Sequence, residues 1–259
     1  MELMKQVEKT VVPAQKVAIF WLGQAGFLLK THEGHTIVID PYLSHYVEHL
    51  FPEMGLGFKR LMPPPCAPEE ICADALLISH EHGDHFDVES IAALLQNGKT
   101  QVYTCHAVAE MMKPLAVDAT RITVLSKGEH AQILPECLLT ATDCDHGDLS
   151  PDAMGWLLSF GTLQVYFAGD TALTPARLGA AIAAKPDVAL LPINGAFGNL
   201  NGTQAAEFAA MLGCKVIIPC HFWTFPLHHG DPQELIDAMP AKAPDVRLCL
   251  LQQGEAYLG

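Results

Sequence analysis

Six consecutive residues of this chain include three histidines and one aspartate, side chains that could bind a metal ion. Residues 80–85 read His-Glu-His-Gly-Asp-His and directly follow an apolar run over residues 75–79. An extended backbone points His80 and His82 the same way, and Gly83 permits a tight turn before Asp84 and His85. Imidazole and carboxylate donors without a thiolate pair are typical of catalytic zinc, manganese or iron sites. Such a polar cluster would be costly to bury alone, so it predicts a metal site rather than a solvated loop.

The elements that must position this stretch are many short strands mixed with helices. Apolar, β-branched runs predict strands over residues 17–22, 26–30, 36–40, 75–79, 101–104, 121–125, 137–143, 156–160, 164–168, 188–191, 216–219 and 246–251. Alanine-rich stretches predict helices over residues 88–96, 107–113, 175–184, 203–212 and 232–238, with Pro175 early in the third and Thr203 as N-cap of the fourth. This pattern indicates an α/β (α+β) fold, and we expect residues 1–259 to form a single domain.

Composition restricts the class of partner. The chain has 259 residues, is 50% hydrophobic and carries a formal net charge of −14. These values indicate a globular protein and argue against nucleic-acid or anionic-membrane partners, which require clustered basic residues. No run approaches the roughly 20 apolar residues of a membrane span, and the start lacks a secretory apolar region. Eight scattered cysteines without a CxxC pair predict reduced thiols and a cytoplasmic location.

One long segment breaks the regular alternation. Residues 42–68 show no periodicity, contain three consecutive prolines at positions 63–65 and carry several aromatic side chains. Loops of this length are usually functional or disordered, and the aromatics together with Lys59 and Arg60 favour function. We therefore interpret residues 42–68 as an active-site loop. Lys59 and Arg60 are candidates to bind a substrate phosphate or carboxylate, with a solvated basic pair as the alternative.

The HxHxDH pattern after an apolar strand resembles the signature of the metallo-β-lactamase superfamily. This resemblance implies a four-layer αββα sandwich with a binuclear metal site along one edge of the two sheets. Carried over residue by residue, it implies seven ligands: His80, His82 and His146 for one ion, Asp84, His85 and His221 for the other, and Asp170 bridging both.

The downstream ligands differ in how well their surroundings match the family. Asp170 in a Gly-Asp-Thr context and His221 after a strand both fit. The surroundings of His146 are not the usual glycine-rich form, so Asp143 or Asp145 remains an alternative ligand.

Two further residues are candidates to assist the site. Asp40, at the end of a predicted strand, is expected to orient a ligand histidine or the metal loop, with a simple turn initiator as the alternative. His228, close in sequence to His221, is expected to line the pocket, although a surface position fits equally well.

Other segments narrow the resemblance. Residues 21–27 (Trp-Leu-Gly-Gln-Ala-Gly-Phe), 39–43 and 205–234 resemble the branch that contains ascorbate-6-phosphate lactonase. A branch containing N-acylphosphatidylethanolamine-hydrolysing phospholipase D has a similar opening. Gly23 and Gly26 predict a tight hairpin. The superfamily resemblance implies two divalent ions, zinc or manganese, whereas the resemblance to the lactonase, which is associated with manganese, allows a single manganese ion as the alternative.

These features imply a metal-dependent hydrolase. Metal-activated water would attack a lactone or phosphodiester bond of a small, anionic substrate, and Asp84 or Asp170 would accept the proton. The alternatives are a nuclease or phosphodiesterase of the same superfamily, which the acidic charge disfavours, and a non-catalytic metal-binding protein, which the complete ligand set disfavours. A flavodiiron-type redox protein is a further alternative. It is disfavoured because that family typically has Glu at the position of His82. A homo-oligomer is compatible with the sequence.

Overall fold

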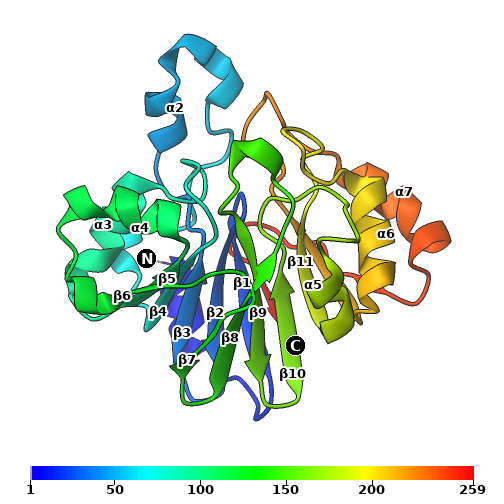
Figure 1. Cartoon of the computed structure of the whole chain (residues 1–259), viewed down its shortest axis with the longest axis horizontal. Coiled ribbons are helices and arrows are strands. Elements are labelled where there is room, and N and C mark those ends of the chain that lie inside the picture. Colours follow the sequence, from blue (N-terminus) through cyan, green and yellow to red (C-terminus); the bar gives the residue numbers. More distant parts are fainter. Residues whose placement is uncertain (1) are drawn as a thin grey trace. The chain divides into compact units, whose positions relative to one another are not determined.

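The computed structural model describes residues 2–259, which divide into two compact units. Unit 1 comprises the chain up to Leu125, residues 224–227 and residues 252–259, and unit 2 comprises residues 126–223 and 228–251. Each unit contains one seven-stranded mixed sheet with helices beside it (Figure 1). The predicted α/β class with two sheets is confirmed. A single domain over residues 1–259 stays a prediction.

The sheet of unit 1 is antiparallel on one side and parallel on the other. Its strands, in spatial order, are β14 (Ala256–Leu258), β1 (Val17–Gly23), β2 (Gly26–Thr31), β3 (Thr36–Ile39), β4 (Ala75–Ile78), β5 (Gln101–Thr104) and β6 (Ile122–Val124). Its helices are α1 (Glu2–Lys9), α2 (Tyr46–Leu50), α3 (Val88–Leu94) and α4 (His106–Met112), with 3-10 turns η1 (Pro52–Phe58), η2 (Pro68–Glu70), η3 (Leu95–Asn97), η4 (Lys113–Leu115) and η5 (Ala119–Arg121).

The parallel pairing of β3 with β4 positions the first metal-binding stretch. Ile39 pairs with Leu77, so both strands end at the same edge of the sheet. Every residue of β4 is buried, which explains its continuous apolar sequence. Asp40 and the stretch that begins at His80 therefore leave the sheet side by side.

The sheet of unit 2 also combines antiparallel and parallel pairs. Its strands, in spatial order, are β13 (Arg247–Leu248), β12 (Val216–Cys220), β11 (Val188–Pro192), β10 (Leu163–Phe167), β9 (Met154–Phe160), β8 (Cys137–Asp143) and β7 (His130–Leu134). Its helices are α5 (Gly179–Ala184), α6 (Gly202–Leu212) and α7 (Pro232–Lys242), with the 3-10 turn η6 (Gly147–Leu149). Figure 1 shows α6 and α7 side by side.

The strand directions of unit 2 bring three candidate ligands to one edge. β9 is antiparallel to both β8 and β10, so these two strands point the same way, and β12 follows this direction through β11. His146, Asp170 and His221 follow the ends of β8, β10 and β12. The order of the strands, rather than sequence proximity, gathers these three residues.

Several predicted boundaries were wrong for local reasons. Helix α5 begins at Gly179, four residues after Pro175. The N-cap of α6 is Asn201 rather than Thr203, because Asn201 and Gln204 form a reciprocal capping box. The predicted strand over residues 246–251 is reduced to the two residues of β13.

The prediction missed four short elements. These are α1, α2, β7 and β14. β14 contains three residues and is defined by its pairing with β1, more than 230 positions earlier in the chain. A local sequence pattern therefore cannot predict it. Within residues 2–259, no helix combines the length and apolar character that a membrane span requires.

The start of α6 provides a test of this packing. A Cβ added to Gly202 would lie 2.5 Å from the backbone N of Leu235 in α7, whereas one added to Gly179 in α5 would meet nothing within 4 Å. We expect Gly202→Ala to destabilise the protein by about 1–3 kcal/mol through overpacking. The matched Gly179→Ala is expected to be neutral or stabilising by up to about 1 kcal/mol. Calorimetric Tm values of both variants check this, and equal Tm values would contradict it.

Candidate metal centre

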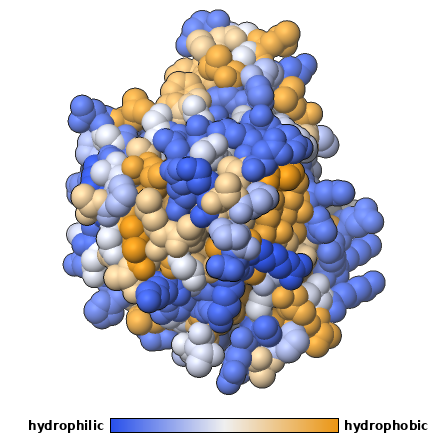
Figure 2. All heavy atoms as spheres, turned by 90° about the vertical axis from the view of Figure 1, so that its right-hand side faces the viewer, coloured by the Kyte–Doolittle hydropathy of each residue, from blue (hydrophilic) through white to orange (hydrophobic). Residues whose placement is uncertain are grey.

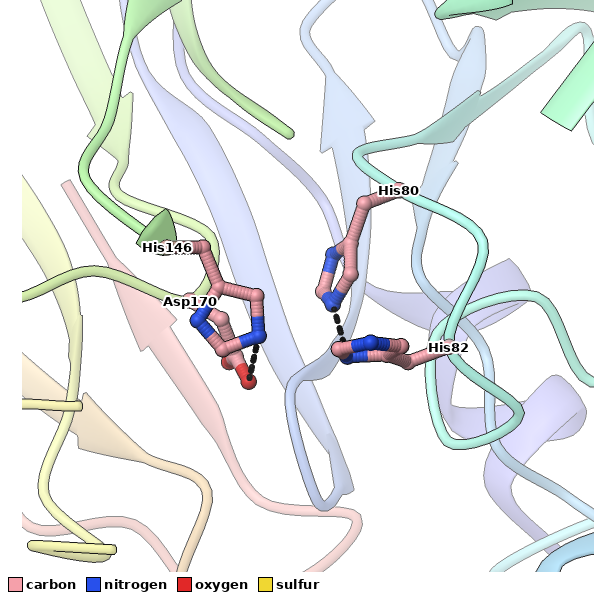
Figure 3. A group of neighbouring side chains, drawn as sticks. All are labelled: His80, His82, His146 and Asp170. Carbon is pink, nitrogen blue, oxygen red and sulfur yellow. Dashed lines mark hydrogen bonds and ion pairs between the residues drawn. The ribbon is translucent and has the colours of Figure 1, made fainter. Parts of the chain in front are cut away.

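Unit 1 gathers one set of candidate ligands at the end of β4. His80 and His85 are fully buried there, while His82 and Asp84 are partly exposed. The Nε2 atom of His80 lies 3.1 Å from the Nδ1 atom of His82 (Figure 3). One donor atom from each of Asp40, His80 and His85 lies within 4.8 Å of the others. The stretch singled out by sequence thus forms a compact group of metal donors.

A buried carboxylate stands behind these histidines. The Oδ2 atom of Asp40 lies 2.7 Å from His85 Nδ1, and Oδ1 accepts a hydrogen bond from the backbone N of Ser79 at 2.8 Å. The Ser79 hydroxyl also donates to Asp40 and lies 2.9 Å from Nδ1 of His80. These contacts occupy the Nδ1 side of both rings and leave Nε2 as the donor for a metal. Asp40 therefore has the contacts expected of a residue that orients ligand histidines.

Gln24 is a second supporting residue, and the sequence did not reveal it. Its Nε2 atom donates to Oδ2 of Asp84 at 2.8 Å, and its side chain is buried. Gln24 lies in the tight turn between β1 and β2, where Gly23 pairs with Gly26, as predicted. It adopts a positive φ of 50°, and Trp21 Nε1 donates to its carbonyl oxygen. The sequence predicted the hairpin, but it did not predict that the side chain of Gln24 contacts Asp84.

The base of the segment over residues 42–68 is held by two buried side chains. Asp87 accepts hydrogen bonds from the backbone N atoms of Leu43 and Ser44. Arg60 donates from Nη1 to the Tyr42 carbonyl oxygen at 2.8 Å and from Nε to that of Met62 at 2.7 Å. Arg60 is thus engaged with the backbone, and this geometry does not support its role in substrate binding, which stays a prediction. Lys59 is exposed.

The same segment packs against the metal-binding stretch. A Cβ added to Gly83 would lie 3.3 Å from the ring of Tyr46 and 3.4 Å from Leu50, both in α2. From the last residue of α2 onward, the segment exposes apolar side chains, visible at the top of Figure 2, where α2 lies in Figure 1. They are Leu50, Phe51, Met54 and Leu56. Helix α2 therefore packs closely on the ligand stretch at Gly83, where a larger residue would need Tyr46 and Leu50 to shift slightly.

Unit 2 gathers the second set of candidate ligands around one carboxylate. Asp170 Oδ2 lies 3.7 Å from His146 Nε2, and Asp170 Oδ1 lies 3.3 Å from His221 Nε2. Figure 3 shows the first of these pairs. All three side chains are buried. One carboxylate with an imidazole at each oxygen is the arrangement that the family resemblance implied for a bridging ligand.

The two acidic alternatives to His146 are engaged elsewhere. Arg177 donates to both oxygens of Asp143 and from Nη1 to Asp145 at 2.8 Å, and Lys127 pairs with Asp143. The Thr174 hydroxyl donates to Asp145 at 2.6 Å. This hydrogen bond, together with Arg177, holds the pKa of Asp145 below its usual value. The structure therefore favours His146 as the donor of this loop.

Asp145 also ties the His146 loop to the Asp170 loop. Its backbone N donates to the Thr171 hydroxyl at 2.9 Å, and its carbonyl oxygen accepts from the backbone N of Ala172 at 2.7 Å. Sequence reasoning considered Asp145 only as a metal donor and missed this role. The contacts fix the spacing of two candidate ligands before any metal binds.

His228 lies beside His221, as expected for a residue near the site. Their ring centroids are 5.7 Å apart, and His228 is buried. The Nδ2 atom of Asn194 lies 3.5 Å from Nδ1 of His228. A surface position is therefore wrong for His228, whereas its contact with substrate stays a prediction.

The donors of the two units suit divalent ions. Together they offer five imidazoles and two carboxylates: His80, His82, Asp84 and His85 from unit 1, and His146, Asp170 and His221 from unit 2. Nitrogen and oxygen donors without thiolates match Zn²⁺, Mn²⁺ or Fe²⁺. Buried carboxylates also require positive charge nearby, which such ions provide.

Comparison with known proteins agrees with this donor set. A family model described as "Beta-lactamase superfamily domain" matches residues 35–222. A "UPF0173 metal-dependent hydrolase" of Herpetosiphon aurantiacus is 31% identical over 248 residues, which cover 92% of this chain and 96% of that protein. One of Aeropyrum pernix is 31% identical over 251 residues, which cover 92% and 95%.

A solved structure shares the fold. Igni18, described as a novel metallo hydrolase from Ignicoccus hospitalis, is similar with a TM-score of 0.72 and 21% sequence identity, covering 95% of this chain and 99% of its own. The narrower resemblance to the lactonase-containing branch stays a prediction. The extent of the family match and the identity with the Herpetosiphon aurantiacus protein show that this chain belongs to the beta-lactamase superfamily, among the relatives named UPF0173 metal-dependent hydrolases.

Proposed function

We propose that this protein is a metal-dependent hydrolase that cleaves an ester-like bond of a small molecule, either a lactone or a phosphodiester. The observation that carries the proposal is the buried Asp170 carboxylate with His146 and His221 at its two oxygens. Family membership and the histidine-rich set of unit 1 add to it. A bridging carboxylate flanked by imidazoles is typical of two-metal hydrolytic sites.

The ligand assignment follows the resemblance to the metallo-β-lactamase superfamily. In this proposal His80, His82 and His146 hold one ion, Asp84, His85 and His221 hold the other, and Asp170 contacts both. When bound, divalent ions lower the pKa of water and polarise the oxygen of the attacked bond. Zinc and manganese both fit these donors, and a single manganese ion is the alternative stoichiometry.

The chain's own groups orient the ligands and accept a proton. Asp40 fixes His85 and, through Ser79, His80, while Asp145 fixes the loops of His146 and Asp170. Gln24 donates to one oxygen of Asp84 and so orients the carboxylate that we propose to accept the proton of the attacking water. Burial of Asp40, Ser79 and His85 keeps water away from these supporting groups, so their interactions act more strongly than in solvent.

Two other functions fit the site less well. A nuclease of this superfamily would need a basic surface for nucleic acid, and the net charge of −14 opposes it. In a protein that only binds metal, Asp84 would have no proton to accept, so the hydrogen bond from Gln24 that orients its carboxylate would have no catalytic purpose. We therefore favour an enzyme with a small-molecule substrate.

Hydrolysis of γ-butyrolactone, 4-nitrophenyl acetate and bis(4-nitrophenyl) phosphate tests the proposal. We expect at least one of them to be turned over, with activity lost on chelation and restored by Zn²⁺ or Mn²⁺. His82→Ala in unit 1 and Asp170→Ala in unit 2 should each lower kcat/KM by at least roughly 100-fold, because metal stabilisation of the transition state amounts to several kcal/mol. The matched control is His229→Ala, since His229 is exposed.

Three results would contradict this proposal. The first is hydrolysis that survives complete metal removal. The second is unchanged activity in His82→Ala or in Asp170→Ala. The third is that fully metal-loaded protein hydrolyses none of the three compounds.

The role of Asp40 has its own test. Asp40→Asn preserves shape and tolerates the positive φ of 41° but weakens the acceptor for His85 Nδ1. We expect metal affinity, measured by competition with a chelator, to fall by about 10- to 100-fold. The control is Asp74→Asn, which alters an exposed carboxylate that accepts from the backbone N of Thr36 at the start of β3. Equal metal affinity in both variants would show that Asp40 does not orient a ligand.

A further inference from the structure

A hollow of ligand size adjoins His146 in unit 2. Its volume is about 320 Å³, at the lower end of the range of small-molecule sites. It is lined by Asp145, His146, Gly147, Asp148, Leu149, Ala172, Phe197 and Gly198. One proposed metal ligand therefore forms part of its wall.

Two large apolar side chains face solvent at this hollow. Leu149 is 53% exposed and Phe197 is 50% exposed. Phe197 also has a positive φ of 53°, which is unfavourable for a bulky residue. Residues kept in strained conformations with exposed aromatic rings are concentrated at functional sites. The chain thus holds an apolar surface open beside a proposed ligand.

The ring of Phe197 is fixed from behind. It meets His228 edge-on, with centroids 5.2 Å apart and an interplanar angle of 87°. His228 in turn lies 5.7 Å from the ring of His221. An edge-to-face contact of this kind holds an aromatic ring in one orientation. The apolar wall is therefore built on the same group of rings as the metal ligands.

The charges around the hollow are unfavourable to an anion. Its charged lining residues are Asp145 and Asp148, and no Lys or Arg of the described chain lines it. The Asp145 carboxylate is already bound by Thr174 and Arg177. Three other lining residues, Gly147, Ala172 and Gly198, have no side chain or only a methyl group and bring no charge.

We propose that this hollow is a substrate subsite that takes an uncharged apolar group, an aromatic ring or a short alkyl chain, attached next to the bond that is hydrolysed. The placement next to that bond rests on the proposed function, because it requires His146 to be a metal ligand. The subsite revises the expected substrate: its part at this wall is neutral and apolar rather than anionic.

Binding of two inert probes to the full-length, Zn²⁺-loaded protein tests the subsite without requiring turnover. Benzyl alcohol and benzenesulfonate carry the same ring and differ in charge. We expect benzyl alcohol to shift the methyl NMR signals of Leu149 and Ala172 saturably. In protein stripped of metal by chelation, where no bound cation attracts the sulfonate, benzenesulfonate should bind there at least roughly fivefold more weakly than benzyl alcohol, the discrimination that about 1 kcal/mol of charge repulsion produces.

Variants of Phe197 identify the wall. Phe197→Gly removes the ring and accepts the positive φ, so the Tm should be unchanged or higher while benzyl alcohol binds roughly three- to tenfold more weakly. Phe197→Leu should retain most of the binding. Ile236→Ala, at an exposed apolar position on α7, is the control and should bind benzyl alcohol normally.

The outcomes separate this subsite from the proposed function. Saturable benzyl alcohol binding that is lost in Phe197→Gly supports the subsite, even in a protein that hydrolyses none of the three test esters. Equal or tighter binding of benzenesulfonate than of benzyl alcohol by the metal-free protein overturns it, as does the absence of shifts at Leu149 and Ala172 in a protein that shows metal-dependent hydrolysis. Equal benzyl alcohol affinity in Phe197→Gly and in the control also overturns it.

Discussion

The hydrogen bond between the Asp40 carboxylate and His85 Nδ1 is the interaction on which the proposed site most depends. Both side chains are fully buried, so an imidazole at this position without a partner would carry a large desolvation cost. The carboxylate fixes the tautomer and the orientation of the ring, and through Ser79 it extends to His80. This contact exists because β3 and β4 are parallel and end at the same edge of the sheet.

In unit 2, the candidate ligands are held in position by hydrogen bonds between loops rather than by a buried carboxylate behind the histidines. There the ligand loops are joined by the backbone of Asp145, the Thr171 hydroxyl and the backbone of Ala172, while the Asp145 side chain is held by Thr174 and Arg177. A salt bridge at a half-exposed arginine contributes little to stability by itself. Its value here is geometric, because it keeps an acidic residue next to His146 from competing as a ligand.

Much of this arrangement was predictable from local patterns. The sequence around residues 80–85 predicted a cluster of metal donors, and the structure gathers it at the end of β4; strand-end positions of Asp170 and His221 were also predicted. Periodicity also located most strands within one or two residues. These inferences succeed where an apolar run ends in polar residues, because strand ends and ligand loops coincide.

The missed features depend on contacts between distant residues. Gln24 reaches Asp84 across 60 positions, and β14 is defined by its pairing with β1. Asp145 and Arg60 have residue types that suit metal or anion binding, yet their partners are within the protein. Composition cannot distinguish a charged group that serves a ligand from one that closes a loop, since the partners are known only in three dimensions.

The measurement that tests the central claim most directly is anomalous diffraction from crystals grown with Zn²⁺ or Mn²⁺. The account predicts two metal peaks in each chain, one bound by His80, His82 and His146 and the other by Asp84, His85 and His221, with Asp170 bound to both. A metal bound by residues of one unit alone, or by residues outside this set, would contradict it.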